Sequence, residues 1–232
     1  RDVRCSSIYD WSQSSGIKIN LMEANLDQMV EYVIAASLAL DSQPGRLLIA
    51  IAGPPASGKS TLASRLQCGF EQHGIACGLL PMDGFHFDNT LLEEQSMLSR
   101  KGSPETFDVD GFTSTVKHLK AGEEVSVPYF NRRLDCVERD AAIITAAQRF
   151  VVVEGNYLFL DDQAWRPLLD MWSLTVFVKP SLELITARLR QRWVEHGMSE
   201  EDAEIRLQLN DLPNARRVLT DINLKDISIV FE

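Results

Sequence analysis

Residues 46–60 read RLLIAIAGPPASGKS, and this stretch decides the fold. Its first part, residues 46–52, is a short apolar run ahead of a glycine, which predicts a strand buried on both faces of a parallel sheet. Its second part, residues 53–60, fits the pattern G-x-x-x-x-G-K-[ST] at every fixed position. Apolar residues then recur at helical spacing over residues 59–73. The chain therefore predicts a strand, a phosphate-binding loop and a helix, in that order.

The loop pattern predicts a site for a nucleoside triphosphate and Mg²⁺. A glycine-rich turn points backbone N–H groups at phosphate oxygens, and the following helix adds its positive N-terminal end. Lys59 supplies a positive charge to the outer phosphates, and Ser60 offers a hydroxyl to Mg²⁺. A dinucleotide-binding loop would need G-x-G-x-x-G, which these residues do not show. The residues expected to bind the nucleotide are Gly53, Pro54, Pro55, Ala56, Ser57, Gly58, Lys59, Ser60 and Thr61.

Four further apolar runs predict strands, and helical patterns separate them. The expected strands are residues 75–82, 149–154, 174–178 and 227–231, and the expected helices are residues 112–119, residues 182–196 and a segment that starts at Ser199. Strands that alternate with helices imply a parallel sheet covered on both faces. We therefore expect an α/β protein, a three-layer α/β/α fold of the P-loop NTPase type with a central parallel sheet of five strands.

Residues 1–43 are interpreted as an N-terminal extension, and residues 44–232 as the domain that carries the loop. Residues 1–19 are polar and Ser-rich without a clear period, whereas apolar residues over 21–40 recur at the spacing of an amphipathic helix. A Pro-Gly pair at residues 44–45 then breaks the chain. The apolar face of the helix could pack on the domain or on a second subunit, so a homodimer stays open.

The bulk composition limits the classes of partner. A net charge of −10 argues against a nucleic-acid partner, because nucleic-acid-binding proteins usually present a basic patch. No apolar run has the length of a membrane-spanning helix and no signal-peptide pattern is present, so we expect a cytoplasmic protein without a membrane partner. The four cysteines form no Cys-x-x-Cys pair, which gives no indication of a zinc or redox site.

Two carboxylates follow predicted strands, at the edge where parallel sheets bind ligands. Asp83 can accept a proton from a substrate hydroxyl, or it can be the turn residue of an Asp-Gly pair. Glu154 can organise Mg²⁺, or it can be the polar end of its strand. A GTPase switch would usually carry Asn-Lys-x-Asp near a late strand, and residues 223–226, NLKD, place the lysine one position late. The two carboxylates therefore favour a kinase.

The predicted helix over residues 182–196 carries Arg188, Arg190 and Arg192. Arg188 and Arg192 are four residues apart and share one face of the helix. Arginines that close over the transferring phosphoryl group would stabilise its spread charge. The alternative is a solvated face that pairs with acids such as Glu195.

Six motifs in a shared order make the chain resemble the uridine kinase, phosphoribulokinase and bacterial pantothenate kinase superfamily of P-loop kinases. Within it, the chain is most similar to proteins described as fructose-transport-system kinases of the nucleoside/nucleotide kinase family. The motifs are residues 53–60, 82–86 (MDGFH), 100–108 (RKGSPETFD), 128–132 (PYFNR), 153–157 (VEGNY) and 210–214 (NDLPN). The resemblance extends over residues 44–231 of the chain.

The resemblance implies roles for individual positions. Asp83 matches the catalytic base, Glu154 matches the acid near Mg²⁺, and Arg188 and Arg192 lie in a stretch that resembles a helical lid. The segment expected to line the acceptor side contains Arg100, Lys101, Phe107 and Asp108, and the segment expected near the adenine contains Asn210, Asp211 and Asn214. Where the family usually has Asp in the Pro-x-[Phe/Tyr]-Asp element, this chain has Asn131.

Three more residues are candidates for contact with the acceptor, each with a second interpretation. His86 can orient the acceptor or cap the turn after Asp83. Arg132, with Arg133 beside it, can hold an anionic group or lie in solvent. Tyr157 can be a platform for the substrate or an aromatic residue of the core.

The sequence as a whole predicts an ATP-dependent, Mg²⁺-requiring kinase that phosphorylates a hydroxyl of a small metabolite, such as a sugar, a nucleoside or a pantothenate-like molecule. The residues expected to carry catalysis are Asp83, Lys59, Glu154, Arg188 and Arg192. The alternative is a nucleotide-binding regulatory module linked to transport, with little or no transfer activity. Asn131 and the unassigned N-terminal helix would suit that alternative.

Overall fold

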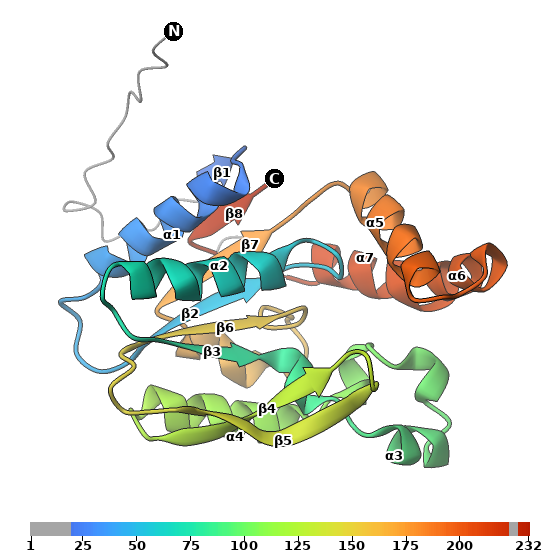
Figure 1. Cartoon of the computed structure of the whole chain (residues 1–232), viewed down its shortest axis with the longest axis horizontal. Coiled ribbons are helices and arrows are strands. Elements are labelled where there is room, and N and C mark those ends of the chain that lie inside the picture. The colour runs from blue at the N-terminus through green and yellow to red at the C-terminus, as the bar shows by residue number, and fades with distance from the viewer. Residues whose placement is uncertain (1–19, 223–226) are drawn as a thin grey trace, which may run out of the picture.

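The computed structural model describes residues 20–222 and 227–232. The irregular segment expected at residues 1–19 and the NLKD sequence at 223–226 lie outside these residues. Six strands form the central sheet in the order β1-β8-β7-β2-β6-β3, with every neighbouring pair parallel (Figure 1). They are β1 (Asn20–Met22), β2 (Leu47–Ala52), β3 (Cys77–Pro81), β6 (Phe150–Gly155), β7 (Leu174–Val178) and β8 (Ile229–Phe231). The α/β fold and its five expected parallel strands are confirmed.

The sixth strand, β1, corrects the expectation that a helix begins near residue 21. The helix α1 (Leu26–Ala39) begins only after Asn25, whose side chain accepts a hydrogen bond from the backbone N–H of Gln28 (3.0 Å). The Gln28 side chain accepts one from the N–H of Asn25 in return (3.0 Å). This capping box gives hydrogen-bond acceptors to the backbone N–H groups of Asn25 and Gln28, so the helix starts directly after Asn25. The residues ahead of it pair with β8 instead. Leu21 and Met22 are only two apolar residues, and they fit a helical and a strand period equally well, so the sequence pattern placed them in the helix.

The strand β2 lies in the middle of the molecule and is buried on both faces. Leu48 and Ala50 face one hydrophobic core, which is covered by α4 (Val109–Lys120) and the 3₁₀ segment η5 (Arg166–Met171). Ile49 and Ile51 face a second core, which is covered by α2 (Lys59–Gln72) and α1. Figure 1 shows these two layers of helices on opposite sides of the sheet. The apolar face of α1 therefore packs on the domain, the first of its two expected alternatives.

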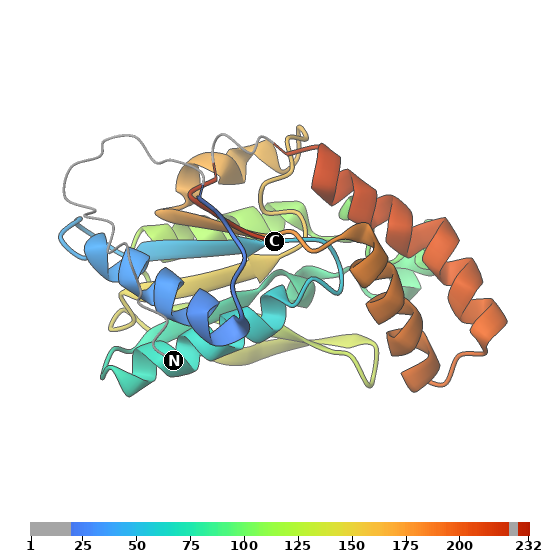
Figure 2. The ribbon, with the colours of Figure 1, turned by 90° about the horizontal axis from the view of Figure 1, so that it is seen from above.

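Two further groups of elements reach the carboxyl ends of the strands. One is the antiparallel hairpin of β4 (Val125–Asn131) and β5 (Cys136–Ile144), which was not expected from the sequence. The other is a helical lid that extends from the sheet (Figure 2), and its helices α5 and α6 match the expected ones. The lid consists of α5 (Leu182–Glu195), α6 (Glu200–Arg206), the π-helical turn η6 (Leu207–Asp211) and α7 (Leu212–Thr220). Shorter elements are η2 (Met82–Phe85), α3 (Asn89–Glu94), η3 (Leu98–Arg100) and η4 (Pro104–Thr106).

The start of β2 is held by a buried arginine. Arg46 is 4 % exposed, and its guanidinium donates to four backbone carbonyl groups. The acceptors are the carbonyl oxygens of Leu119 (3.1 Å), Glu123 (2.7 Å), Thr145 (2.7 Å) and Gln148 (3.0 Å). The guanidinium therefore ties the end of α4 and the turn before β6 to the strand that leads into the phosphate loop.

None of the helices in the described parts of the chain combines the length and the apolar character needed to cross a membrane.

Candidate active site

The loop between β2 and α2 has the backbone conformation that a phosphate cradle requires. Gly58, at the N-cap of α2, has a φ of 97°, and Ala56 has a φ of 59°, both in the left-handed region that L side chains rarely adopt. A Cβ atom on Gly53 would lie 2.5 Å from the carbonyl oxygen of Val178 and 2.8 Å from Ser57 Oγ, so only glycine fits there. The loop encloses a cavity of 120 Å³ lined by Pro55, Ala56, Gly58, Lys59, Ser60, Thr61, Arg132, Asn156 and Arg192, which we call the phosphate cavity.

Lys59, Ser60 and Glu154 meet at the rim of this cavity. The Ser60 hydroxyl donates to Glu154 Oε2 (3.1 Å), and both Lys59 and Glu154 are buried. Burial raises the pKa of Glu154, against the attraction of the Lys59 ammonium. Burial lowers the pKa of Lys59, against the attraction of Glu154 and Asp83. A hydroxyl and a carboxylate at this separation are hard oxygen donors of the kind that Mg²⁺ binds together with water and phosphate oxygens, so the pair fits that ion.

Asp83 lies in η2, directly after β3, and faces Glu154 across a second cavity. Its carboxylate accepts a hydrogen bond from Arg132 Nη2 at 2.5 Å. Burial raises the pKa of Asp83, but the positive charges of Arg132, Lys59 and Arg192 outweigh it and hold the pKa below its usual value. Asp83 is therefore an ionised carboxylate at neutral pH. The second cavity, which we call the acceptor cavity, has a volume of 190 Å³ and is lined by Ser60, Ser64, Leu79, Pro81, Asp83, Tyr129, Phe130, Arg132 and Glu154.

The helix α5 directs two of its three arginines toward the loop. Arg188 Nη1 donates to the carbonyl oxygens of Ala56 (3.1 Å) and Ser57 (3.3 Å). Arg192 lines the phosphate cavity, and burial lowers the pKa of its guanidinium. Arg190 points elsewhere and pairs with Glu204 of α6 (2.8 Å). Arg188 and Arg192, four residues apart, therefore both lie at the loop. Arg190 lies on another face of α5 and links two lid helices.

The segment of residues 100–108 lies behind the acceptor cavity and supports it. Phe107 is buried and forms an isolated antiparallel bridge with His86, and their rings lie 4.0 Å apart. His86 Nδ1 donates to the carbonyl oxygen of Asp83 (2.8 Å), so this ring caps the turn that carries the carboxylate. Burial lowers the pKa of His86, against the attraction of Asp83. Tyr157 is fully buried and donates to the carbonyl oxygen of Gly102 (2.5 Å), which makes it a core residue.

Lys101 and Arg100 are neighbours with different environments. The Lys101 ammonium is buried and donates to Asn89 Oδ1 (2.7 Å), Asp135 Oδ1 (2.8 Å) and the carbonyl oxygen of Asp135 (3.2 Å). It also lies over the Phe130 ring, 4.9 Å from the ring centroid. Lys101 thus joins the tip of the β4–β5 hairpin to α3, whereas the Arg100 side chain is 59 % exposed and pairs with Glu105 at 3.3 Å.

Lys101→Met is expected to lower the free energy of unfolding by about 2 kcal/mol, because it removes hydrogen bonds made by a buried charge. Methionine keeps the length of the side chain and its contact with Phe130. The matched control, Arg100→Met, is expected to stay within about 0.5 kcal/mol, since exposed ion pairs contribute little. Urea unfolding of both variants measures the difference, and equal losses would show that the hairpin is not held through Lys101.

Asn210 and Asn214 form a buried chain of hydrogen bonds away from both cavities. Asn214 Nδ2 donates to Asn210 Oδ1 (3.1 Å), and Asn210 Nδ2 donates to the carbonyl oxygen of Lys101 (2.9 Å). Asp211 accepts from Trp193 Nε1 (2.6 Å). The bond from Asn210 joins the lid to the segment behind the acceptor cavity, whereas the other two connect elements within the lid. The expected contact of Asn214 with the nucleotide stays a prediction.

Three residues that line the two cavities belong to motifs of the sequence, but the sequence analysis did not name them as site residues. Asn156 follows β6 and lines the phosphate cavity, and its buried Oδ1 has no hydrogen-bond partner among the residues that the structure describes. Tyr129 and Phe130 belong to β4 and line the acceptor cavity. Asn156 could have been found by the rule that found Asp83 and Glu154, because it follows a buried strand at the same edge. The two aromatic residues needed the hairpin to be known.

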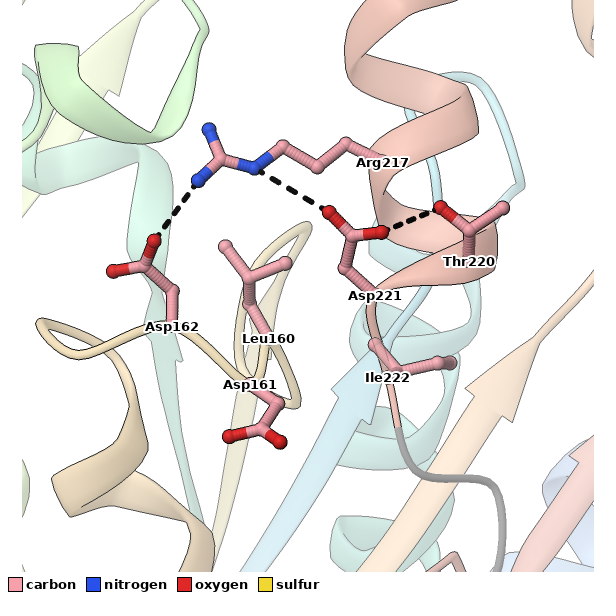
Figure 3. A pocket seen from close by; sticks show the side chains of 7 residues that line it. All are labelled: Leu160, Asp161, Asp162, Arg217, Thr220, Asp221 and Ile222. Carbon is pink, nitrogen blue, oxygen red and sulfur yellow. Dashed lines mark hydrogen bonds and ion pairs between the residues drawn. The ribbon is translucent and has the colours of Figure 1, made fainter.

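A third cavity, of 410 Å³, shares no lining residue with the first two (Figure 3). Three of its seven lining residues are acidic: Asp161, Asp162 and Asp221. Arg217 bridges Asp162 (3.0 Å) and Asp221 (3.8 Å) across its mouth. No residue that the sequence singled out for chemistry lies in this cavity.

Comparisons with known proteins find a matching family model and several similar proteins. The model of the "Phosphoribulokinase / Uridine kinase family" matches residues 48–206. The "Uncharacterized protein YggC" of Escherichia coli is 32% identical over 90% of this chain and 86% of its own length. The pantothenate kinase of Streptococcus gordonii is 30% identical over 63% of this chain and 48% of the enzyme, so the match spans about half of that enzyme. The crystal structure of a "putative fructose transport system kinase" from Silicibacter sp. TM1040 covers 90% of this chain and 100% of its own, with 37% identity and a TM-score of 0.82.

Proposed function

The chain belongs to the phosphoribulokinase/uridine kinase family, and on that premise we propose that it transfers the γ-phosphoryl group of ATP to a hydroxyl of a small metabolite. One observation carries the proposal. The phosphate cavity and the acceptor cavity meet, because Ser60 and Arg132 line both. A phosphoryl group at the end of the first cavity would therefore lie beside a hydroxyl in the second.

The charged residues at this junction suit phosphoryl transfer. Lys59 and Arg192 line the phosphate cavity and would stabilise the negative charge that spreads over the transferring group. Asp83 is ionised and lies in the acceptor cavity, where it would orient the hydroxyl and take its proton. Arg132 would have to share or release Asp83 when the hydroxyl arrives, since it now occupies that carboxylate.

Ser60 and Glu154 are the residues that would hold Mg²⁺. Their oxygens lie 3.1 Å apart beside the phosphate cavity, and Glu154 is fixed by the pairing of β6 with β3 opposite Pro81. Bound there, Mg²⁺ would supply charge neutralisation on the phosphate chain. The Ser60 hydroxyl, which now donates to Glu154, would turn its lone pair to the ion.

The acceptor cavity suits a compact polar molecule with an apolar side. Tyr129 and Phe130 provide aromatic surface, while Asp83 and Arg132 provide a hydrogen-bond acceptor and donors. The relatives include a pantothenate kinase and a protein described as a fructose transport system kinase, so sugars, nucleosides and pantothenate-like molecules are the acceptor classes that we propose.

Asn131 has a structural role that separates it from the transfer chemistry. Its Oδ1 accepts hydrogen bonds from the backbone N–H groups of Arg133 and Leu134 (both 3.1 Å), and its Nδ2 donates to Glu138 (2.7 Å). It therefore caps the turn of the hairpin, as Asn often does. Asn131 is not among the residues that line the acceptor cavity, so its lack of a negative charge gives no specific support to a regulatory module without transfer.

An acceptor screen tests the proposal. With labelled ATP and Mg²⁺, we expect phosphate to move to one class among sugars, nucleosides and pantothenate-like compounds, and to do so only when that acceptor is present. The Lys59→Ala variant, which lacks the buried charge of the loop, is the negative control. Slow hydrolysis without transfer to any acceptor would contradict the kinase and favour the regulatory module, and tighter binding of GTP than ATP would favour a GTPase switch.

A further inference from the structure

A large open cavity continues from the phosphate cavity toward the N-terminal helix. Its volume is 720 Å³, and it shares Ala56, Gly58, Thr61 and Arg192 with the phosphate cavity. A chain of phosphates held by the loop would therefore lead directly into this space. The space has the size of a small-molecule site. Apolar residues and polar or charged residues contribute equally to its lining.

Two walls of this cavity come from helices that are far apart in the sequence. One wall is the end of α5, with Gln191, Glu195 and the C-cap residue His196. The facing wall is the start of α1, with Leu26, Met29 and the preceding Ala24. Figure 2 shows the start of α1 and the helix α5 on either side of the end of α2 that follows the loop. The residues of α1 lie outside the region that the family model matches, residues 48–206.

The α1 wall is held firmly against the loop helix. Leu26 and Met29 are three residues apart and share a face, directly after the capping box that starts α1. Farther along, a Cβ atom on Gly69 of α2 would lie only 2.6 Å from Ile34 Cδ1, so the side chains of α1 pack directly against the backbone of α2 at this glycine. Asp27 also pairs with Arg65 of α2. Any ligand in the cavity would therefore meet a preformed apolar surface.

We propose that Ala24, Leu26 and Met29 form the wall against which the nucleoside of the phosphate donor packs, so that the N-terminal helix is part of the nucleotide site. This inference rests on the proposed function, because it takes a nucleoside triphosphate as the donor. The apolar side chains of α1 contact the face of the base, and Gln191 and Glu195, joined by a hydrogen bond of 2.7 Å, lie on the opposite wall with polar groups for its edge.

Binding of two probes to the full chain tests the wall separately from the loop. Isothermal titration calorimetry with MgATP measures both halves of the site, whereas Mg-tripolyphosphate, which has no nucleoside, measures the loop alone. The double variant Leu26→Ala/Met29→Ala is expected to weaken MgATP about tenfold through lost apolar contact, and to leave the Kd of tripolyphosphate unchanged. Val30→Ala, which trims the next residue of α1 against Gly69, is the control and should leave both affinities unchanged.

Three outcomes decide between the inference and the function it rests on. Unchanged MgATP affinity in the double variant overturns the wall, while nucleotide binding and the proposed function stand. An equal loss for both probes also overturns it, because the loop itself would then be disturbed. If the unaltered protein binds tripolyphosphate but not MgATP, both the wall and the ATP-dependent function fail.

Discussion

Asp83→Asn is expected to lower kcat by about 100-fold or more, while the Kd of MgATP stays the same. Asparagine keeps the size of the side chain and can still contact Arg132, but it cannot take a proton from the acceptor hydroxyl. Asp83 lies in the acceptor cavity rather than in the phosphate cavity, so the loop that binds ATP is left intact. Steady-state kinetics with the acceptor from the screen, together with calorimetry for MgATP, measures the two quantities separately.

The neighbouring Asp88 provides a matched control. It is exposed and caps α3 by accepting a hydrogen bond from the N–H of Leu91 (2.9 Å). Asparagine caps helices as well as aspartate does, so Asp88→Asn should keep both kcat and stability. A wild-type kcat in Asp83→Asn would remove Asp83 from the chemistry, although the assignment to the family would stand.

Arg46→Met is expected to destabilise the protein by about 3 kcal/mol, because it leaves one buried and three partly buried carbonyl groups without their donor. In a chain of this length, such a loss corresponds to a fall in Tm on the order of 10 °C. The acceptors lie 73 to 102 residues away along the chain, so a single side chain joins segments that no local contact connects. Thermal and urea unfolding measure the loss.

Arg65→Met is the control for this experiment. Arg65 is 54% exposed and pairs with Asp27, which is itself 76% exposed, so its removal should cost less than about 0.5 kcal/mol. A comparable loss in both variants would mean that burial of the Arg46 guanidinium adds nothing to stability. If Arg46→Met keeps its affinity for MgATP at a low temperature, where the variant is folded, then Arg46 acts on folding rather than on the nucleotide site.

Five of the six strands of the central sheet could be predicted because they are mostly buried on both faces, which leaves a continuous apolar run. The run of residues 46–52 and the valines at 151–153 are read directly in this way. The hairpin gives no such run, since β5 (CVERDAAII) is exposed along most of its length. Its pairing depends on β4 and on the bonds of Lys101, which are distant in sequence. Strand prediction therefore succeeded where burial is two-sided and failed where it is not.

The same reasoning separates the site residues that could be predicted from those that could not. Lys59 and Ser60 belong to a local pattern, whose geometry the loop itself imposes. The contact between Arg132 and Asp83 joins positions 49 residues apart and requires the hairpin to fold over η2. Arg100 and Lys101 look alike in sequence, yet one is exposed and the other buried, because only Lys101 faces Asn89 and Asp135.

The position of β1 at the edge of the sheet has a consequence for solubility. Beyond β7, the strand β8 would present a free row of backbone N–H and C=O groups, which is a template for pairing with another chain. β1 covers that row through a register that joins Asn20 to Ile229 and Met22 to Phe231. β1 and β8 both span three residues, so β1 moves the free edge one strand farther from the buried strands β7 and β2. The edge that remains is short and offers little length for intermolecular pairing.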